Sequence, residues 1–98
     1  MMEIKEGEAM ENRFQPGDLA RHFKRDRLSP EELAREPERY LYDILGTAEH
    51  TETGETLMIY RPRYGERKLY ARPLAMFLSP VDREKYPDAK QFYRFEKV

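Results

Sequence analysis

The sequence contains no cysteine and only two serines. The absence of cysteine excludes a disulfide framework, a zinc–thiolate site and a thiolate nucleophile, and it predicts a reducing, cytoplasmic environment. Ser29 and Ser79 each precede a proline, and at such a position a helix-capping role is sufficient. This inventory favours a non-enzymatic protein over an enzyme.

Glycine clusters and long apolar runs are also missing. The five glycines are isolated, which excludes the glycine-rich loop of a nucleotide hydrolase. No stretch approaches the roughly 20 apolar residues of a membrane-spanning helix. The acidic start of the chain lacks the apolar segment of a signal peptide. We therefore expect neither secretion nor contact with a membrane.

Histidine is limited to His22 and His50, so a metal site or an acid–base pair has few candidate members. His50 stands beside Glu49 at the start of a hairpin loop, where a solvated histidine is the favoured interpretation. His22 follows Asp18 closely enough for a proton shuttle, but a strand histidine facing solvent or a carboxylate is favoured. We predict no metal and no cofactor. A small-ligand or enzyme site that uses His22 or His50 with nearby carboxylates is the alternative.

Length and composition predict one small domain. The chain has 98 residues, of which 39% are hydrophobic, 38% charged and 12% aromatic. Because hydrophobic residues are few, the aromatic ones must supply much of the core. We predict a flexible leader over residues 1–14 and a single domain over residues 15–98, which includes a helical insertion at 29–36 and a C-terminal extension at 82–98.

Charges are segregated along the chain although the net charge is only −1. Glutamates gather in residues 3–11, 31–38 and 49–55. Basic residues gather in two other stretches, residues 21–27 and 61–72. A nearly neutral total therefore conceals a basic face.

Period-two alternation predicts the strands. Residues 17–23 are expected to form a first strand that turns Leu19 and Phe23 inward, and a long strand begins at Tyr40. Gly54 supplies the positive φ of the hairpin loop that follows.

The next two strands, residues 56–61 and 68–72, are expected to form a second hairpin with Gly65 at the tip of its loop. Their alternation is predicted to place one set in the core, namely Leu57, Ile59, Leu69 and Ala71. The other set then points away from the core, namely Met58, Tyr60, Lys68, Tyr70 and Arg72. Pro73 ends the last of these strands because proline donates no ladder hydrogen bond.

Helical signals are short. In "LSPEEL", Ser29 can cap a helix that starts at Pro30, with Glu32 completing a capping box. Pro37 ends this helix after about two turns. The segment "LAMFL", residues 74–78, predicts a 3₁₀ turn that inserts apolar side chains into the core. A short helix is expected at 82–86, and the aromatic tail after it must pack on the domain.

Together these elements predict a mainly β fold: a small SH3-like barrel or roll of about five strands, with a short inserted helix, a 3₁₀ turn and an aromatic C-terminal tail. At "AEHTETGE", "LYARPLAMF" and "VDREKYP" the chain resembles a widespread bacterial family, domain of unknown function 1653. The resemblance covers roughly residues 16–96. It implies an SH3-type barrel and marks residues 25–39 as an added helical segment. It implies no activity, ligand or site residue.

The candidate binding surface is the outward face of the second hairpin together with its loop. Basic and aromatic side chains gather there: Tyr60, Arg61, Arg63, Arg67, Lys68, Tyr70 and Arg72. Tyrosine rings stack on bases and basic side chains neutralise phosphates, and the same set suits an acidic protein. We therefore expect a non-enzymatic binding or adaptor module whose partner is a nucleic acid or an acidic protein.

Two other interpretations of this surface remain open at the level of the sequence. In the first, the inserted helix or the aromatic tail packs on the surface and its charges serve the fold. In the second, exposed strands or the tail assemble a homodimeric scaffold.

Overall fold

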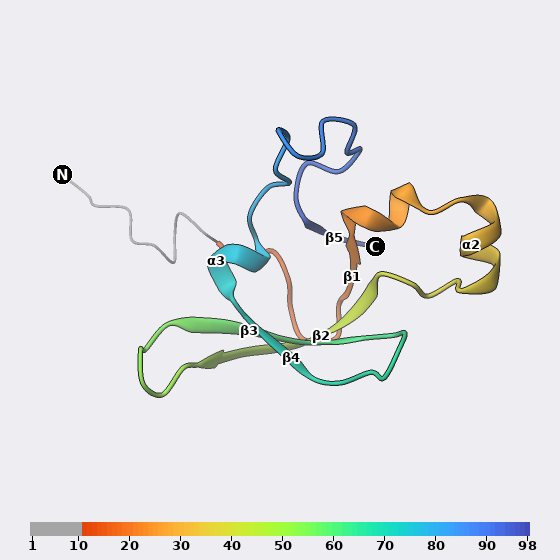
Figure 1. Cartoon of the computed structure of the whole chain (residues 1–98). Helices are drawn as coiled ribbons and strands as arrows, with labels where there is room; N and C mark the ends of the chain where they lie inside the picture. Colours follow the sequence, from red (N-terminus) through yellow and green to blue (C-terminus); the bar gives the residue numbers. More distant parts are fainter. Residues whose placement is uncertain (1–10) are drawn as a thin grey trace.

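The chain folds around one antiparallel sheet with short helical segments between its strands (Figure 1). The computed structural model describes residues 11–98. In chain order the elements are β1 (Leu19–His22), the 3₁₀ helix η1 (Phe23–Arg27), α2 (Pro30–Arg35), β2 (Leu41–Glu49), β3 (Thr56–Pro62), β4 (Tyr70–Pro73), α3 (Leu74–Phe77) and β5 (Phe95–Lys97). The predicted mainly β architecture is confirmed.

The five strands lie in the order β4-β3-β2-β1-β5, and every neighbouring pair is antiparallel. β5 comes from the end of the chain and pairs with β1, so the aromatic tail supplies the fifth strand. The helix expected at 82–86 is instead a single turn, in which the Tyr86 N–H donates to the Asp82 carbonyl at 2.8 Å. The sheet therefore joins the two ends of the described chain.

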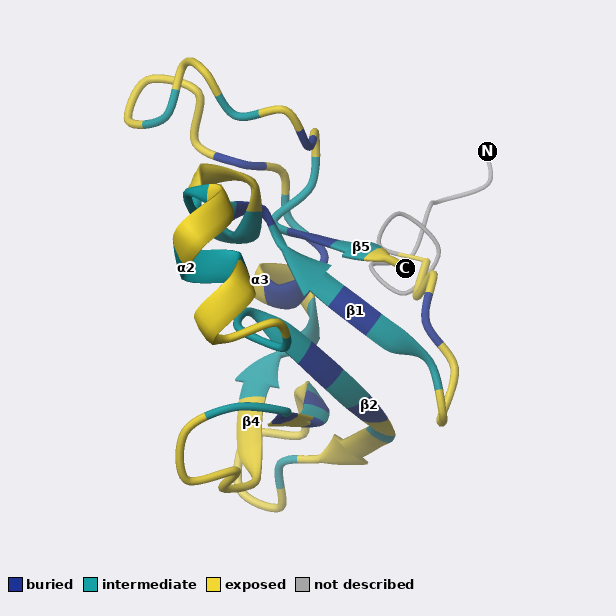
Figure 2. Cartoon of the chain, turned by 90° about the vertical axis from the view of Figure 1, so that its right-hand side faces the viewer, coloured by how far each residue is buried: buried dark blue, intermediate teal, exposed yellow. Residues whose placement is uncertain are grey.

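The inserted helix α2 begins and ends where its sequence predicts. The Ser29 hydroxyl accepts from the Glu32 N–H at 3.1 Å, and the Glu32 carboxylate accepts from the Ser29 N–H at 2.8 Å. Pro30 opens the helix, and Arg35 is its last residue, just before Glu36-Pro37. α2 has no buried residue and lies beside the sheet as a largely exposed element (Figure 2).

The inner face of β3 is the opposite of the one that alternation predicted. Met58 and Tyr60 are buried, whereas Leu57 and Ile59 are only partly buried. Register decides the face, because Tyr60 lies opposite the buried Ile44 and opposed residues share a face. β3 is apolar on both faces, so its own alternation does not reveal which face the register selects.

β4 is also turned the other way from the prediction. It runs over Tyr70–Pro73 rather than residues 68–72, and Leu69, expected inside, is 56% exposed just before it. Tyr70 lies opposite Tyr60, and Arg72 lies opposite Met58. Tyr70 and Arg72 therefore project from the same face as the core residues of β3.

β1 shows a similar reversal. Ala20 is buried, while Leu19, expected inside, is only partly buried. Phe23 is buried as predicted, but it belongs to η1, because the strand ends at His22. A bulge in β2 leaves Leu45 without a ladder partner between the paired residues Ile44 and Gly46, and such a bulge bends a sheet.

The core is largely aromatic and closes between α3 and β5. Phe77 stacks on Phe95 with a centroid separation of 4.0 Å, and Phe14 meets Phe77 edge to face at 5.5 Å. The segment 74–78 thus buries Phe77 and Leu78 as predicted, although its turn is α-helical and the 3₁₀ helix lies at η1. Phe14, the last residue of the predicted leader, is part of this core. Residues 1–10 of that leader lie outside the described residues.

Candidate functional site

A pocket of about 590 Å³ opens where β4 faces the ends of β1 and β5. These strands are far apart in the order of the sheet, so the pocket lies at the seam where the bent sheet does not close on itself. Its walls combine aromatic rings, an imidazole and two cations: His22, Lys24, Tyr40, Tyr42, Tyr60, Tyr70, Ala71, Arg72, Pro73, Met76 and Phe95. We call it the seam pocket.

Edge-to-face packing fixes the floor of the seam pocket. The ring of Tyr60 lies 5.6 Å from that of Tyr42, 5.7 Å from that of Tyr70 and 5.9 Å from that of Phe95. The hydroxyls of Tyr42 and Tyr64 share a hydrogen bond of 2.6 Å. Such ring pairs add stabilisation beyond the area that they bury, so the floor is preorganised.

The phenols of Tyr42 and Tyr60 carry no charge at neutral pH. Burial raises the pKa of Tyr42 and of Tyr60, because the ionised form loses its hydration. For Tyr60 the positive charge of Arg72 opposes this rise in pKa without cancelling it. The formal charge of the seam pocket therefore comes from Lys24 and Arg72.

His22 lies on the wall of this pocket as a neutral ring. Burial, followed by the nearby charges of Lys24, Arg72 and Arg94, lowers the pKa of His22 to about 4. The His22 Nδ1 accepts from the Lys24 N–H at 3.1 Å, so the neutral ring carries its proton on Nε2. The His22 Nε2 has no hydrogen-bond partner among the described residues. Every buried side-chain nitrogen or oxygen in that part of the chain has a partner, so this Nε2 is not buried and reaches solvent. It is a donor available to a ligand.

A second pocket of about 290 Å³ adjoins the first. It shares His22, Lys24 and Arg72 with the seam pocket, and its other walls are Phe23, Asp82, Lys85, Tyr86 and Arg94. We call it the basic pocket. The three shared residues form the ridge between the two pockets.

The basic pocket has an excess of positive charge. Four cations line it, namely Lys24, Arg72, Lys85 and Arg94, against the single carboxylate of Asp82. That carboxylate accepts from the N–H groups of Glu84 at 3.0 Å and Lys85 at 3.3 Å. Within residues 11–98 none of the four cations forms an ion pair. The arrangement is suited to an anion.

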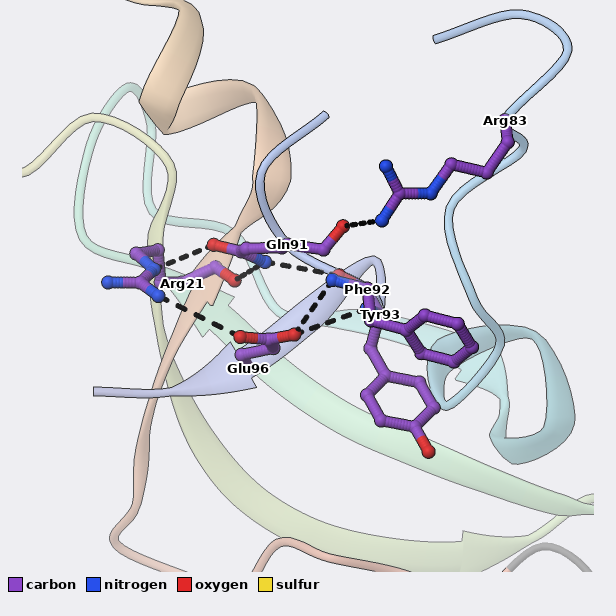
Figure 3. A network of polar contacts seen from close by, with 6 residues as sticks. All are labelled: Arg21, Arg83, Gln91, Phe92, Tyr93 and Glu96. Atoms are coloured by element: carbon purple, nitrogen blue, oxygen red, sulfur yellow. Dashed lines mark hydrogen bonds and ion pairs between the residues drawn. The ribbon is translucent and has the colours of Figure 1, made fainter. Parts of the chain in front are cut away.

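A polar network holds the segment that supplies Lys85, Tyr86 and Arg94 (Figure 3). Gln91 is 3% exposed, and its Oε1 accepts from the Arg21 Nε at 2.6 Å. Its side-chain nitrogen donates to the backbone carbonyls of Arg21 and Tyr93. The backbone carbonyl of Gln91 accepts from the Arg83 guanidinium at 3.0 Å. The Glu96 carboxylate also accepts from the N–H groups of Phe92 and Tyr93. Because both polar atoms of the Gln91 side chain have partners within the fold, this network positions the segment rather than binding a ligand.

The structure divides the seven residues of the sequence-predicted surface. Tyr60, Tyr70 and Arg72 come together in the seam pocket, although they point toward the core side instead of away from it. Arg61 follows Tyr60 in β3 and is exposed on the other face of the sheet. The predicted hairpin face is therefore not one surface.

The remaining cations of that surface lie outside both pockets. Arg63 pairs with Asp43 at 3.0 Å and with Glu38, from the end of the insertion, at 3.5 Å, so its charge serves the fold. Lys68 pairs with Glu66 at 3.0 Å in the exposed loop. Arg67 is exposed in the same loop with a positive φ of 57°.

The two histidines of the alternative site lie apart, and His22 shares the basic pocket with the carboxylate of Asp82. His50 sits in the β2–β3 loop, where its Nδ1 accepts from the N–H groups of Glu52 and Thr53 at 3.1 and 3.3 Å. Asp18 pairs with Lys97 at 3.2 Å. Over residues 11–98 no group of three His, Cys, Asp or Glu side chains is placed to hold a metal ion.

Sequence reasoning missed four of the lining residues that carry or shape the site, namely Lys24, Tyr40, Lys85 and Arg94. Lys24 lies in the basic stretch of residues 21–27, and the tail contains both aromatic and charged residues. The missing information was the pairing of β5 with β1, which brings the tail to His22. Tyr40 adopts a left-handed φ of 65°, which the sequence around it does not predict.

The chain matches the family model described as "Protein of unknown function (DUF1653)" over residues 19–97. It therefore belongs to that family. Neither the curated proteins nor the solved structures contain a match. The SH3-like name stays a prediction that rests on the strand order and the helical turn before the last strand. In the part of the chain that the structure describes, no helix is long and apolar enough to cross a membrane.

Proposed function

We propose that this member of the DUF1653 family is a non-enzymatic binding module that holds an anionic partner at the seam and basic pockets. The observation that carries the proposal is the set of four cations without ion pairs around two adjoining pockets. Cations without an ion pair in the fold keep their charge available to a ligand, and a concave site strengthens the combined field of several such charges. Because the whole chain has a net charge of −1, the excess of positive charge at these pockets is a local property.

The aromatic floor supports the same proposal. Rings that are already packed lose little freedom when a ligand covers them, so contact with them is favourable. The walls of the seam pocket include no carboxylate, so a cationic ligand would meet Lys24 and Arg72 without compensation. The pockets therefore suit an anion that also presents an apolar or planar part.

Salt-dependent binding tests the proposal. Labelled oligothymidylate and labelled polyglutamate are titrated with the protein between about 50 and about 200 mM salt, and anisotropy reports binding. We expect binding to at least one polyanion, weakening steeply as salt rises. Lys24→Ala and Arg72→Ala should each weaken it and, for the single strand, reduce the slope of log K against log salt by about 0.7.

Arg61→Ala is the matched control. It removes one exposed charge from β3 without touching either pocket, and Arg61 forms no ion pair among the described residues. We expect it to leave the affinity close to that of the unchanged protein. Binding that Arg61→Ala weakens as much as Arg72→Ala does would return the site to the outer face and contradict the proposal, as would the absence of binding to either polyanion.

A further inference from the structure

We propose that the two pockets together hold one nucleotide unit, with the base in the seam pocket and its phosphate in the basic pocket. This inference rests on the proposed function and names the chemistry of its ligand. It requires a planar ring and an anionic group that are joined through a spacer, which is how a base and a phosphate are joined through a sugar. The unit is either a free nucleotide or part of a single strand.

The seam pocket has the features of a ring site. Tyr70 is 46% exposed, so part of its ring remains accessible, and the ring of Tyr60 packs against it at 5.7 Å. Tyr40 packs edge to face on Tyr64 at 5.6 Å and lines the same pocket. Bases stack on tyrosine rings irrespective of sequence because every base has a π face.

The basic pocket has the features of a phosphate site. Lys85 and Arg94 line it and are absent from the seam pocket, so the positive charge extends beyond the rings. Its one carboxylate is that of Asp82, and the Oδ1 of this group accepts from two backbone N–H groups. Charge-assisted hydrogen bonds from arginine and lysine to phosphate oxygens are about twice as strong as neutral ones.

The ridge between the pockets is consistent with a ligand in which a spacer joins the ring to the phosphate. His22, Lys24 and Arg72 line both pockets, so one ligand that spans the ridge contacts all three. The neutral His22 presents its Nε2–H there as a hydrogen-bond donor for a sugar or phosphate oxygen. A carboxylate-rich peptide offers anions but no ring for the seam pocket. A phosphate attached directly to a ring lacks the spacer of a nucleotide.

The experiment compares ligands that lack one part each. Oligothymidylate, an abasic oligonucleotide of the same length, thymidine monophosphate, thymidine and phenyl phosphate are titrated in low salt. We expect the abasic strand to bind at least about tenfold more weakly than oligothymidylate, because it has lost its stacking. Thymidine monophosphate should bind more tightly than both thymidine and phenyl phosphate.

Variants separate the two compartments. Tyr70→Ala should lower the affinity for oligothymidylate about tenfold and leave the affinity for the abasic strand unchanged. Tyr70→Phe should restore the affinity for oligothymidylate. Lys85→Ala and Arg94→Ala should lower the affinity for thymidine monophosphate and leave the affinity for thymidine unchanged. Leu69→Ala is the matched control for Tyr70, because Leu69 is exposed beside it and lines neither pocket. Thermal unfolding of each variant confirms that it is folded.

Each outcome decides one point. Mononucleotide binding as tight as that of the strand identifies a free nucleotide as the ligand, and much tighter strand binding identifies a single strand. Equal binding of the abasic strand, or an unchanged affinity in Tyr70→Ala, overturns the nucleotide inference while anion binding stands. Polyglutamate that competes with equal strength, or phenyl phosphate that matches thymidine monophosphate, also overturns it. Absence of binding to every polyanion removes the proposed function as well.

Discussion

Tyr60 and Tyr70 lie directly opposite each other on β3 and β4, and their rings meet edge to face at 5.7 Å. Tyr60 is 4% exposed and Tyr70 is 46% exposed. One pair of neighbouring tyrosines thus links the aromatic core to the rim of the seam pocket. On this face of the sheet, Tyr60 packs in the core, and Tyr70 on the neighbouring strand is accessible to a ligand.

This difference in burial predicts unequal losses of stability. Tyr60→Ala should lower the free energy of unfolding by about 3–5 kcal/mol, because it opens a cavity among Tyr42, Phe77 and Phe95. Tyr70→Ala should cost about 1 kcal/mol or less, since its ring is half exposed. Denaturant unfolding at equilibrium measures both. Equal losses would show that Tyr60 is not the inward residue of the pair.

The buried amide of Gln91 predicts a second effect on stability. Gln91→Ala removes the partner of the Arg21 Nε and of two backbone carbonyls. We expect a loss of about 1–3 kcal/mol in the free energy of unfolding, because buried polar groups lose their partners. Gln15→Ala, at an exposed position, should change stability by no more than about 0.5 kcal/mol. If both variants unfold at the same denaturant concentration, the network of Figure 3 is not a structural anchor.

The lowered pKa of His22 predicts a dependence of stability on pH. The folded pKa is about 4 and the ordinary value is 6.5, so the unfolded chain binds the proton more tightly between these two values. Stability is therefore fully present above the ordinary pKa and falls as pH decreases through this window. From about pH 7 to about pH 5 the loss should be about 1–2 kcal/mol.

His22→Asn is the variant that isolates this contribution. Its amide oxygen can accept from the Lys24 N–H as Nδ1 does, so the N-terminus of η1 keeps its cap. We expect the variant to lose less stability than the unchanged protein over the same pH range, as measured by denaturant unfolding at each pH. Parallel curves for the two proteins would mean that His22 titrates normally in the fold.

Local chemistry in the sequence predicts the elements whose causes are local. The capping box of Ser29 and Glu32, the proline stops and the positive φ of Gly54 all act within a few residues, and the structure has each of them. Alternation predicts strands at the positions of β1 to β4, and the apolar segment 74–78 predicts the turn that buries Phe77. These features could therefore be predicted before any long-range contact was known.

The inner faces of the strands depend on register, and register is a long-range property. β3 carries apolar side chains on both faces, so a choice between Ile59 and Tyr60 needs the pairing of Tyr60 with Ile44. The candidate site has the same origin. Tyr70 and Arg72 were identified as site residues for their chemistry, but Lys85 and Arg94 join them only because β5 pairs with β1.

The location of the anion site is tested most directly by mapping backbone amide NMR shifts during titration with oligothymidylate. The pockets predict that the largest shifts fall at Lys24, at residues 70–72, at Lys85 and at Arg94, and that Arg61 and Arg67 stay close to their starting positions. Shifts centred on Arg61 and Arg67, with the residues of both pockets unmoved, would contradict the account.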